Sequence, residues 1–251
     1  MVKIKSCIMT FHALILFSLT LTLASCGGGG GGASGGGSGG APQSQESKAF
    51  VAPIQGEKRV FTTTIANVDG AMATYNTDEV IAQVNADGSY TANWSSDGYS
   101  LDGNSYGSQS GTDTYNDVGD AISAQLHQGL STNPCTNIYP SGGRPVAMQP
   151  GQTWDASFVS TCSGISGTAT LTQTGTYFGV ENVNVPAGSF LAYKFQTSQV
   201  ISTSVTLNIV SWYDASATDS RLVRVRWQYL YSNEALNSQS MDHLDLQLAS
   251  Y

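Results

Sequence analysis

Histidine, serine and acidic side chains would carry hydrolytic chemistry, and their positions in this sequence form no recognisable catalytic pattern. The chain has 3 histidines. His243 lies on the polar side of a regularly alternating segment, and His127 stands in a segment without a nucleophile motif. No Cys-x-x-Cys pair accompanies the histidines to bind a metal. We therefore expect no catalytic residue, no metal site and no cofactor.

The segment from Ser95 to Asp120 is rich in Asp, Asn, Gly and Ser, which predicts either turns between short strands or one long loop. Asp102, with Asp113 at the twelfth place, imitates a calcium-binding loop, but Tyr106 replaces an oxygen ligand. Three tyrosines here could stack on a sugar or be ordinary sheet residues: Tyr99, Tyr106 and Tyr115. A hydrolase of polysaccharide or peptide is therefore the alternative to a non-enzymatic protein.

Basic side chains are few. Charged residues make up 11% of the chain, with 10 Lys and Arg against 18 Asp and Glu. This excess of negative charge disfavours nucleic acid as a partner. Arg224 and Arg226 project from the same side of a predicted strand. An anion site there is conceivable, although such arginines more often lie in water opposite carboxylates.

The first 25 residues have the three parts of a secretory signal. Lys3 and Lys5 form a basic start, an apolar stretch runs from about Cys7 to Leu23, and small residues follow. A transmembrane anchor is the alternative, but the stretch is at the short limit for spanning a bilayer. Removal of both lysines leaves 8 basic against 18 acidic residues, a net charge of −10.

The segment Leu23-Ala24-Ser25-Cys26 resembles the lipobox of bacterial lipoproteins. The resemblance implies cleavage between Ser25 and Cys26 and acyl chains, such as palmitate, on Cys26, enough for stable membrane attachment. Gly27 in place of Asp implies the outer membrane of a Gram-negative bacterium, with the protein facing either the periplasm or the cell surface. An ordinary signal peptide with a chance cysteine is the alternative.

The residues after Cys26 predict a tether and then one folded unit. Gly27 to Gly40 contains eleven glycines, a composition typical of a flexible coil. Ala41 to Gln55 is polar with two prolines and continues the tether. We therefore divide the chain into a signal peptide (1–25), a lipidated cysteine with its tether (26–55) and a single β domain (56–251).

Two of the four cysteines are left for the folded part. Cys7 lies in the expected signal and Cys26 in the lipobox. Cys135 and Cys162 remain, and in an oxidising compartment we expect them to form one structural disulfide, worth roughly 3–4 kcal/mol by chain entropy.

Alternating polar and apolar residues predict a mainly all-β fold. In Arg221 to Leu230, apolar side chains alternate with Arg224, Arg226 and Gln228. Leu244, Leu246 and Leu248 continue the pattern, and Ala86-Asp87-Gly88 marks a hairpin. We expect a curved antiparallel sheet, either a half-barrel or open and barrel-like, with at most one or two short helices. The best candidate for a helix is Asp117 to Gly129, from its four-residue spacing of apolar residues.

Three motifs between Gln149 and Leu230 carry a second resemblance. They are Val185-Pro186-Ala187-Gly188-Ser189-Phe190 with Tyr193-Lys194-Phe195, Pro150-Gly151-Gln152-Thr153-Trp154, and Trp212-Tyr213-Asp214 followed by Leu222-Val223. The sequence resembles a broad class of uncharacterised bacterial envelope proteins with a V-P-A-G-[ST]-F turn, a class similar to half-barrels of the lipoprotein-carrier type. Many members of that class have no known activity. From the long alternating sheet on a lipid tether without a catalytic motif, we expect a non-enzymatic binding or structural module of the envelope that binds an apolar ligand or an envelope protein. The turn itself is expected to be a feature of the fold, and the oligomeric state stays open.

Overall fold

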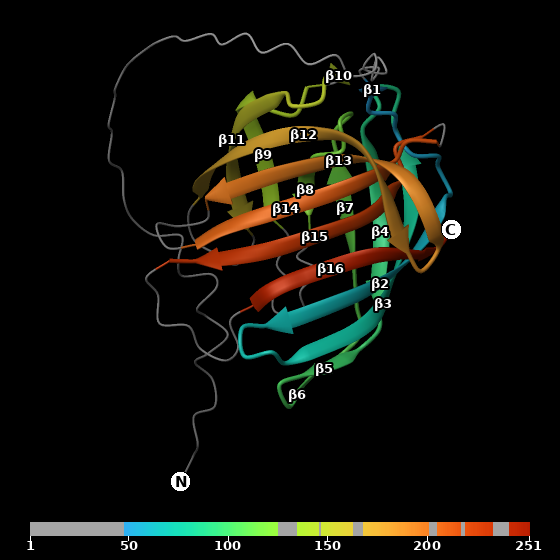
Figure 1. Ribbon diagram of the computed structural model, residues 1–251, viewed down its shortest axis with the longest axis vertical. Helices are drawn as coiled ribbons and strands as arrows, with labels where there is room; N and C mark the ends of the chain where they lie inside the picture. The colour runs from blue at the N-terminus through green and yellow to red at the C-terminus, as the bar shows by residue number, and fades with distance from the viewer. Residues whose placement is uncertain are drawn as a thin grey trace, which may run out of the picture.

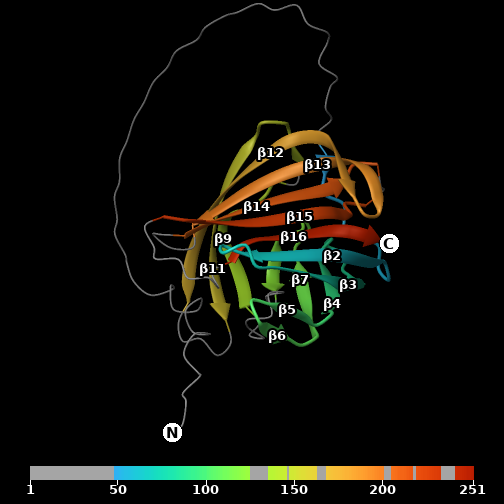
Figure 2. The ribbon, with the colours of Figure 1, turned by 60° about the horizontal axis from the view of Figure 1, so that its bottom comes forward.

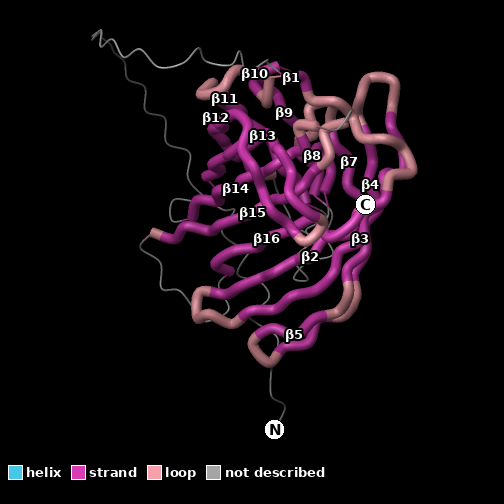
Figure 3. The backbone as a smooth tube through the Cα atoms, turned by 45° about the vertical axis from the view of Figure 1, so that its right-hand side comes forward, coloured by secondary structure: helices cyan, strands magenta, loops and turns pink. Residues whose placement is uncertain are grey.

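A computed structural model describes residues 48–124, 135–145, 147–162, 168–200, 205–216, 219–232 and 241–251. Within these residues the secondary structure consists of strands, without a helix, as the tube drawing shows (Figure 3). The strands are β1 (Lys48–Ala49), β2 (Lys58–Asn67), β3 (Met72–Val84), β4 (Tyr90–Ser96), β5 (Tyr99–Leu101), β6 (Asn104–Tyr106), β7 (Gln109–Tyr115), β8 (Ala121–Ala124), β9 (Cys135–Gly142), β10 (Ala147–Met148), β11 (Thr153–Cys162), β12 (Ala169–Val185), β13 (Gly188–Val200), β14 (Val205–Asp214), β15 (Leu222–Tyr231) and β16 (Met241–Ser250).

Twelve strands form one closed antiparallel barrel in the order β11-β12-β13-β14-β15-β16-β2-β3-β4-β7-β8-β9. Pairing of β9 with β11 closes the ring. In Figure 1 the strands from β12 through β16 to β2 cross the front of the molecule, while β4, β7, β8 and β9 run steeply behind them. The expectation of an all-β fold is confirmed. The sheet, which was expected to be a half-barrel or open and barrel-like, forms a closed barrel.

The alternating patterns of the sequence become the two faces of this barrel. Leu244 of β16 lies between Ile65 of β2 and Trp227 of β15 in the ladder, and the three side chains pack in one apolar cluster. The intervening residues of these strands, such as Thr64 and Asp245, belong to the other face. Because one face is apolar and buried, the period-2 pattern fixes the register of each strand.

Short strands and turns make up the segment from Ser95 to Asp120. β5 and β6 form a hairpin that turns at Asp102 and Gly103, both with positive φ (51° and 71°). It lies at the lower end of the barrel (Figure 2). β7 then returns to the barrel beside β4. Of the two expectations for this segment, turns between short strands is the one observed.

The helix expected from Asp117 to Gly129 is wrong where the structure describes the segment. Asn116 accepts backbone N–H bonds from Val118 (3.1 Å) and Asp120 (2.8 Å) through its side-chain oxygen, and Gly119 has a φ of 77°. This side-chain turn competes with a helical turn at its start. The chain then enters β8, which pairs with β7 and β9. The end of the predicted helix, from residue 125, lies outside the described residues.

The chain joins the fold before residue 56. β1 pairs with β10, and the backbone N–H of Val51 donates to Ser220 Oγ at 2.9 Å. The ring of Phe50 meets Tyr213 edge to face with centroids 5.8 Å apart. Residues between 48 and 55, which the sequence assigned to the tether, therefore contact the barrel.

The described residues include no helix long and apolar enough to cross a membrane.

Candidate functional site

Of the two histidines considered for catalysis, the structure describes one. His243 contacts its own neighbour Asp242, with Nδ1 and Oδ2 2.8 Å apart, on the partly exposed side of β16. His127 lies outside the described residues. Arg224 makes a two-bond pair with Asp245, in which Nε donates to Oδ1 at 2.9 Å and Nη2 donates to Oδ2. Arg224 is thus paired with a carboxylate, as the simpler reading of the sequence held.

Asp102 and Asp113, the ends of the calcium-like loop, have different surroundings. Asp102 is exposed in the β5–β6 turn, whereas Asp113 is 2% exposed in β7. There Asp113 accepts hydrogen bonds from Trp94 Nε1 (3.2 Å) and from the Tyr115 hydroxyl (3.4 Å). The segment between the two acids is interrupted by β6, so it does not have the continuous form of a calcium loop.

The three tyrosines considered as a sugar platform stack on other tyrosines of the protein. Tyr99 stacks between Tyr75 and Tyr106, with ring centroids 4.4 and 4.8 Å apart. Tyr115 stacks on Tyr90 at 4.7 Å. Tyr99 thus stacks with two other tyrosines, and Tyr106 and Tyr115 stack with one each, so part of their ring surface is used within the protein.

The two remaining cysteines lie opposite each other in the backbone register. Cys135 of β9 is the Cα partner of Cys162 of β11, in the strand pair that closes the barrel. Of their side chains the structure describes nothing, and the same holds for Ser25 and Cys26, which precede the described residues. The disulfide and the lipid therefore stay predictions.

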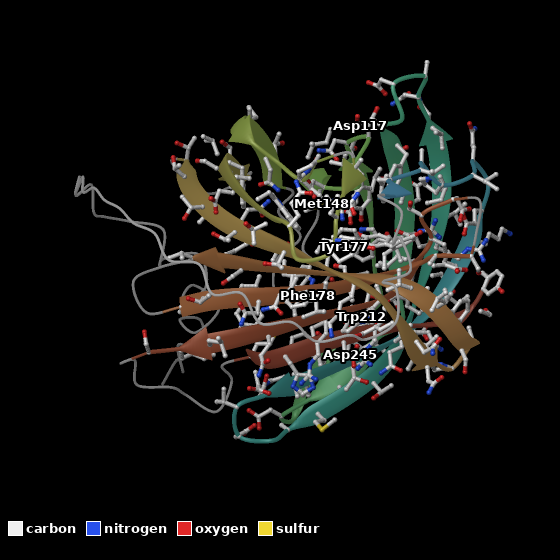
Figure 4. All side chains as sticks on the ribbon, turned by 45° about the horizontal axis from the view of Figure 1, so that its top comes forward. Asp117, Met148, Tyr177, Phe178, Trp212 and Asp245 are labelled. Carbon is white, nitrogen blue, oxygen red and sulfur yellow. The ribbon has the colours of Figure 1, made fainter. Side chains whose placement is uncertain are left out.

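Each of the three motifs of the second resemblance contributes one residue to a group of inward-facing residues that we name the Arg144 site. The group consists of Trp154, Phe195 and Tyr213 from the motifs, together with Arg144 and Tyr177. They come from β11, β12, β13, β14 and the segment between β9 and β10. Tyr177 and Met148, which packs against Tyr177 and Trp154, lie among the side chains in the middle of the barrel (Figure 4).

Trp154 is positioned by the turn that precedes it. Gly151 donates its backbone N–H to Tyr177 O at 2.7 Å, and Tyr177 donates to Gln152 O at 3.0 Å. This sets Trp154 directly opposite Gly175. Since Gly175 has no side chain, the indole lies over it so closely that an added Cβ would be 2.0 Å from Cζ2. The Pro150–Trp154 motif thus positions the indole in the barrel interior.

Alternation along β13 and β14 supplies the other rings. Phe195 stacks on Tyr177 at 4.9 Å between centroids and meets Tyr213 edge to face at 5.9 Å. Lys194 lies on the opposite face, where its Nζ is 3.2 Å from Glu181 Oε1. Trp212, beside Tyr213 in sequence, donates from Nε1 to the same Glu181 oxygen at 2.7 Å. Lys194 and the buried Trp212, which is 8% exposed, therefore share Glu181 on that face, while Phe195 and Tyr213 line the site.

The V-P-A-G-S-F turn has a role in the fold. It forms the tip of the β12–β13 hairpin, where Gly188 has a φ of 135° and the backbone N–H of Ala187 donates to Leu248 O at 2.9 Å. Figure 1 shows this hairpin bending across the ends of the neighbouring strands near the C-terminus. Only glycine adopts such a φ easily, which explains the Gly in this motif.

Arg144 lies among three rings. Its Cζ is 5.3 Å from the centroid of Phe50, 5.1 Å from that of Phe195 and 5.4 Å from that of Tyr213, distances typical of cation–π contacts. The side chain is 7% exposed, and its Nε lies 3.8 Å from Asp120 Oδ1. Burial opposes the charge of Arg144, but interactions with Tyr213 and Asp120 outweigh it and raise the pKa. The guanidinium is therefore cationic at neutral pH.

Several buried polar atoms of this region have no hydrogen-bond partner among the described residues: Nε and Nη2 of Arg144, Nε1 of Trp154, the hydroxyl of Tyr177 and Oδ2 of Asp120. Burial, together with Tyr193, raises the pKa of Tyr177 to about 12, so its hydroxyl keeps its proton. Buried polar groups without partners are costly, and each calls for a ligand, water or another explanation.

Sequence reasoning did not single out Arg144 or Phe50. Arg144 follows two glycines and precedes a proline, a context that indicates only a loop. Phe50 was assigned to the tether. Their contact depends on segments far apart in the chain, and no local pattern signals it.

The chain matches no family model and no curated protein. Among solved structures it is similar to a protein described as exported, with a YmcC-like fold, from Bacteroides fragilis (16% identity, 80% of this chain and 98% of that one, TM-score 0.45). It is also similar to a protein described as a lipoprotein from Parabacteroides distasonis (12% identity, 82% and 99%, TM-score 0.37). A third likeness is to the hypothetical lipoprotein YmcC from Escherichia coli (12% identity, 79% and 90%, TM-score 0.35). With TM-scores below 0.5, we draw no argument about function from these likenesses.

Proposed function

We propose that this chain is a lipid-anchored protein of the bacterial cell envelope whose barrel binds a small apolar ligand without transforming it. The anchor is the lipid on Cys26, in the outer membrane, and the Gly-rich tether holds the barrel away from the bilayer. The barrel itself faces either the periplasm or the cell surface.

The observation that carries the binding role is the Arg144 site. Aromatic rings line it, and several of its buried hydrogen-bonding atoms are unused among the described residues. Ligand sites typically combine such apolar walls with a few polar groups that fix orientation. A closed barrel of twelve strands is also wider than the eight strands whose interior side chains just fill.

Hydrolysis of an envelope polysaccharide or peptide has less support. Asp113 is hydrogen-bonded to Trp94 and Tyr115, and His243 to Asp242. Neither residue is paired with a nucleophile among these contacts. A binding protein needs no such pairing, and the chemistry of the Arg144 site suits recognition.

Native mass spectrometry tests the binding role. Residues 41–251, recovered from the cell envelope under gentle conditions, are expected to retain a non-covalent adduct that is lost on denaturation. Replacement of Phe195 by Ala removes the ring at the centre of the site and is expected to reduce the adduct, whereas the exposed Phe178→Ala variant serves as control. A consistently empty wild-type protein would contradict the proposal.

A further inference from the structure

Among the described arginines, Arg144 is the one whose Nε and Nη2 are both buried without a hydrogen-bond partner; Arg226 has a buried Nε without one. Arg59 and Arg224, which are also partly or fully buried, use the same two atoms. Arg59 donates from Nε and Nη2 to the two oxygens of Glu57, each at 3.1 Å. Arg224 donates from the same two atoms to the two oxygens of Asp245. In Arg144, Nε and Nη2 are both buried without a hydrogen-bond partner in the described part of the chain.

The edge formed by Nε and Nη2 matches the geometry of a carboxylate, which accepts two parallel hydrogen bonds from it. Two other unused groups of the site are also donors, since Trp154 Nε1 donates only and the protonated Tyr177 hydroxyl can donate, whereas Asp120 Oδ2 is an acceptor. A ligand that satisfies the donors must be rich in acceptors, and a carboxylate has about four acceptor positions.

Asp120 is the internal candidate for this edge. Its Oδ1 lies 3.8 Å from Nε of Arg144, within ion-pair range but beyond a hydrogen bond, and its Oδ2 has no hydrogen-bond partner in the described segments. Asp120 is held by its backbone, which exchanges hydrogen bonds with Asn116. It lowers the net positive charge of the site without occupying the two-atom edge.

Aromatic rings make up much of the remaining described surroundings of Arg144, and Gly119 lies so close to Nη2 that an added Cβ would be 2.9 Å from it. Phe50, Phe195 and Tyr213 cover the guanidinium, and Trp154 meets Phe195 with ring centroids 6.4 Å apart. The acid that fits here therefore has an apolar body for these rings and one carboxylate for the cation.

We infer that Arg144 is the carboxylate receptor of this barrel and that the ligand is an apolar organic acid, held by Nε and Nη2 of Arg144 with Trp154 and Tyr177 beside them. The inference rests on the proposed binding function and specifies its ligand class.

The test compares acids with their neutral isosteres. The protein is the chain from residue 26 onward with Cys26→Ser, secreted behind a cleavable signal, which contains every residue that the structure describes. The probes are benzoate and benzamide, then octanoate and octanamide, measured by calorimetry. We expect one acid to bind at least roughly tenfold more tightly than its amide, since a charged acceptor is favoured at a buried cation.

Variants identify the receptor. Arg144→Gln is expected to weaken acid binding by roughly thirtyfold or more. Arg144→Lys keeps the positive charge but lacks the two-atom edge of Nε and Nη2, and it is expected to weaken acid binding by a smaller factor. Asp120→Asn removes a competing anion and is expected to strengthen acid binding by roughly fivefold. Lys194→Gln, on the opposite face of β13, is the matched control and should leave affinity unchanged.

An indole resonance gives an independent readout. The chain has 4 tryptophans. Trp94 and Trp212 already donate from Nε1 to Asp113 and Glu181. On addition of the acid, the indole N–H signal of Trp154, assigned from Trp154→Phe, is expected to move downfield while those two signals stay in place.

The outcomes separate the inference from the proposed function. Equal binding of an acid and its amide, or unchanged acid binding by Arg144→Gln and Arg144→Lys, overturns the carboxylate receptor and leaves ligand binding intact. Absence of binding by all four probes, with a native adduct that is neutral, also overturns the inference alone. Absence of both probe binding and any native adduct overturns the inference and the proposed function together.

Discussion

Gly175 is the position where the structure makes its sharpest prediction about stability. A Cβ added there would lie 2.0, 2.2 and 2.4 Å from Cζ2, Cε2 and Cη2 of Trp154. Ordinary contacts begin at 3.4 Å, so in Gly175→Ala the indole must retreat by about 1.4 Å. Because Trp154 is held between Gly175 and the rings of the Arg144 site, this retreat disturbs the packing of the whole cluster.

The expected change in the free energy of unfolding of Gly175→Ala follows from two opposed effects. Overpacking a filled interior costs about 1–3 kcal/mol. Replacing glycine by alanine restricts the unfolded chain and returns about 0.4–1 kcal/mol. We expect a net loss of about 1–2 kcal/mol in the free energy of unfolding, which corresponds to a fall in Tm of roughly 2–8 °C for a domain of this size.

Urea unfolding followed by near-ultraviolet circular dichroism measures the effect, with Gly107→Ala as control because a Cβ there meets nothing within 4 Å. The same change is then made in a Trp154→Ala background, where the clash is absent and alanine at 175 should be neutral or stabilising. A Gly175→Ala protein as stable as wild type, or the same loss in both backgrounds, would refute the close packing of Trp154 on Gly175.

The other predictions concern the anchor, the barrel seam and the acid response. Cys26→Ser is expected to abolish palmitate labelling and membrane partitioning; a variant that stays labelled and membrane-bound would disprove the lipid anchor. Cys135 and Cys162 are expected to form a disulfide, which would make the protein about 2 Da lighter before reduction than after it. Reduction of this disulfide is expected to lower the free energy of unfolding by roughly 3–4 kcal/mol. Two free thiols in protein from the oxidising compartment would contradict the pairing. The half-buried Glu57 has a pKa that burial would raise but that hydrogen bonds and charges of Arg59 and Arg221 lower below its usual 4.5. Its stabilising effect is present above the unfolded-state pKa and is lost as pH falls through the folded-state pKa. Glu57→Gln should therefore show a shallower loss of stability on acidification below about pH 4.5 than wild type, with exposed Asp97→Asn as control; parallel stability curves would argue against this linkage.

Local sequence patterns predicted the structure correctly where the alternation of polar and apolar residues lies within a single strand or hairpin. The alternation in Arg221–Leu230 and around Leu244 predicted β15 and β16 with the correct faces, because successive side chains of a strand point to opposite sides. The loop at Ala86–Gly88 predicted the β3–β4 hairpin, where Gly88 has a φ of 85°. The helix from Asp117 failed because the side-chain bonds of Asn116 outweighed a weak apolar spacing.

What the sequence determined by itself was therefore the all-β class, the faces of its clearest strands and the expectation of a secreted, lipid-anchored chain. The tertiary structure decided that β9 pairs with β11 and closes the barrel. It also brought Phe50, Arg144 and Tyr213 together from distant parts of the chain. The physical reason is that the faces of a strand follow from its own residues, whereas an arginine among aromatic rings depends on which strands become neighbours when the sheet closes.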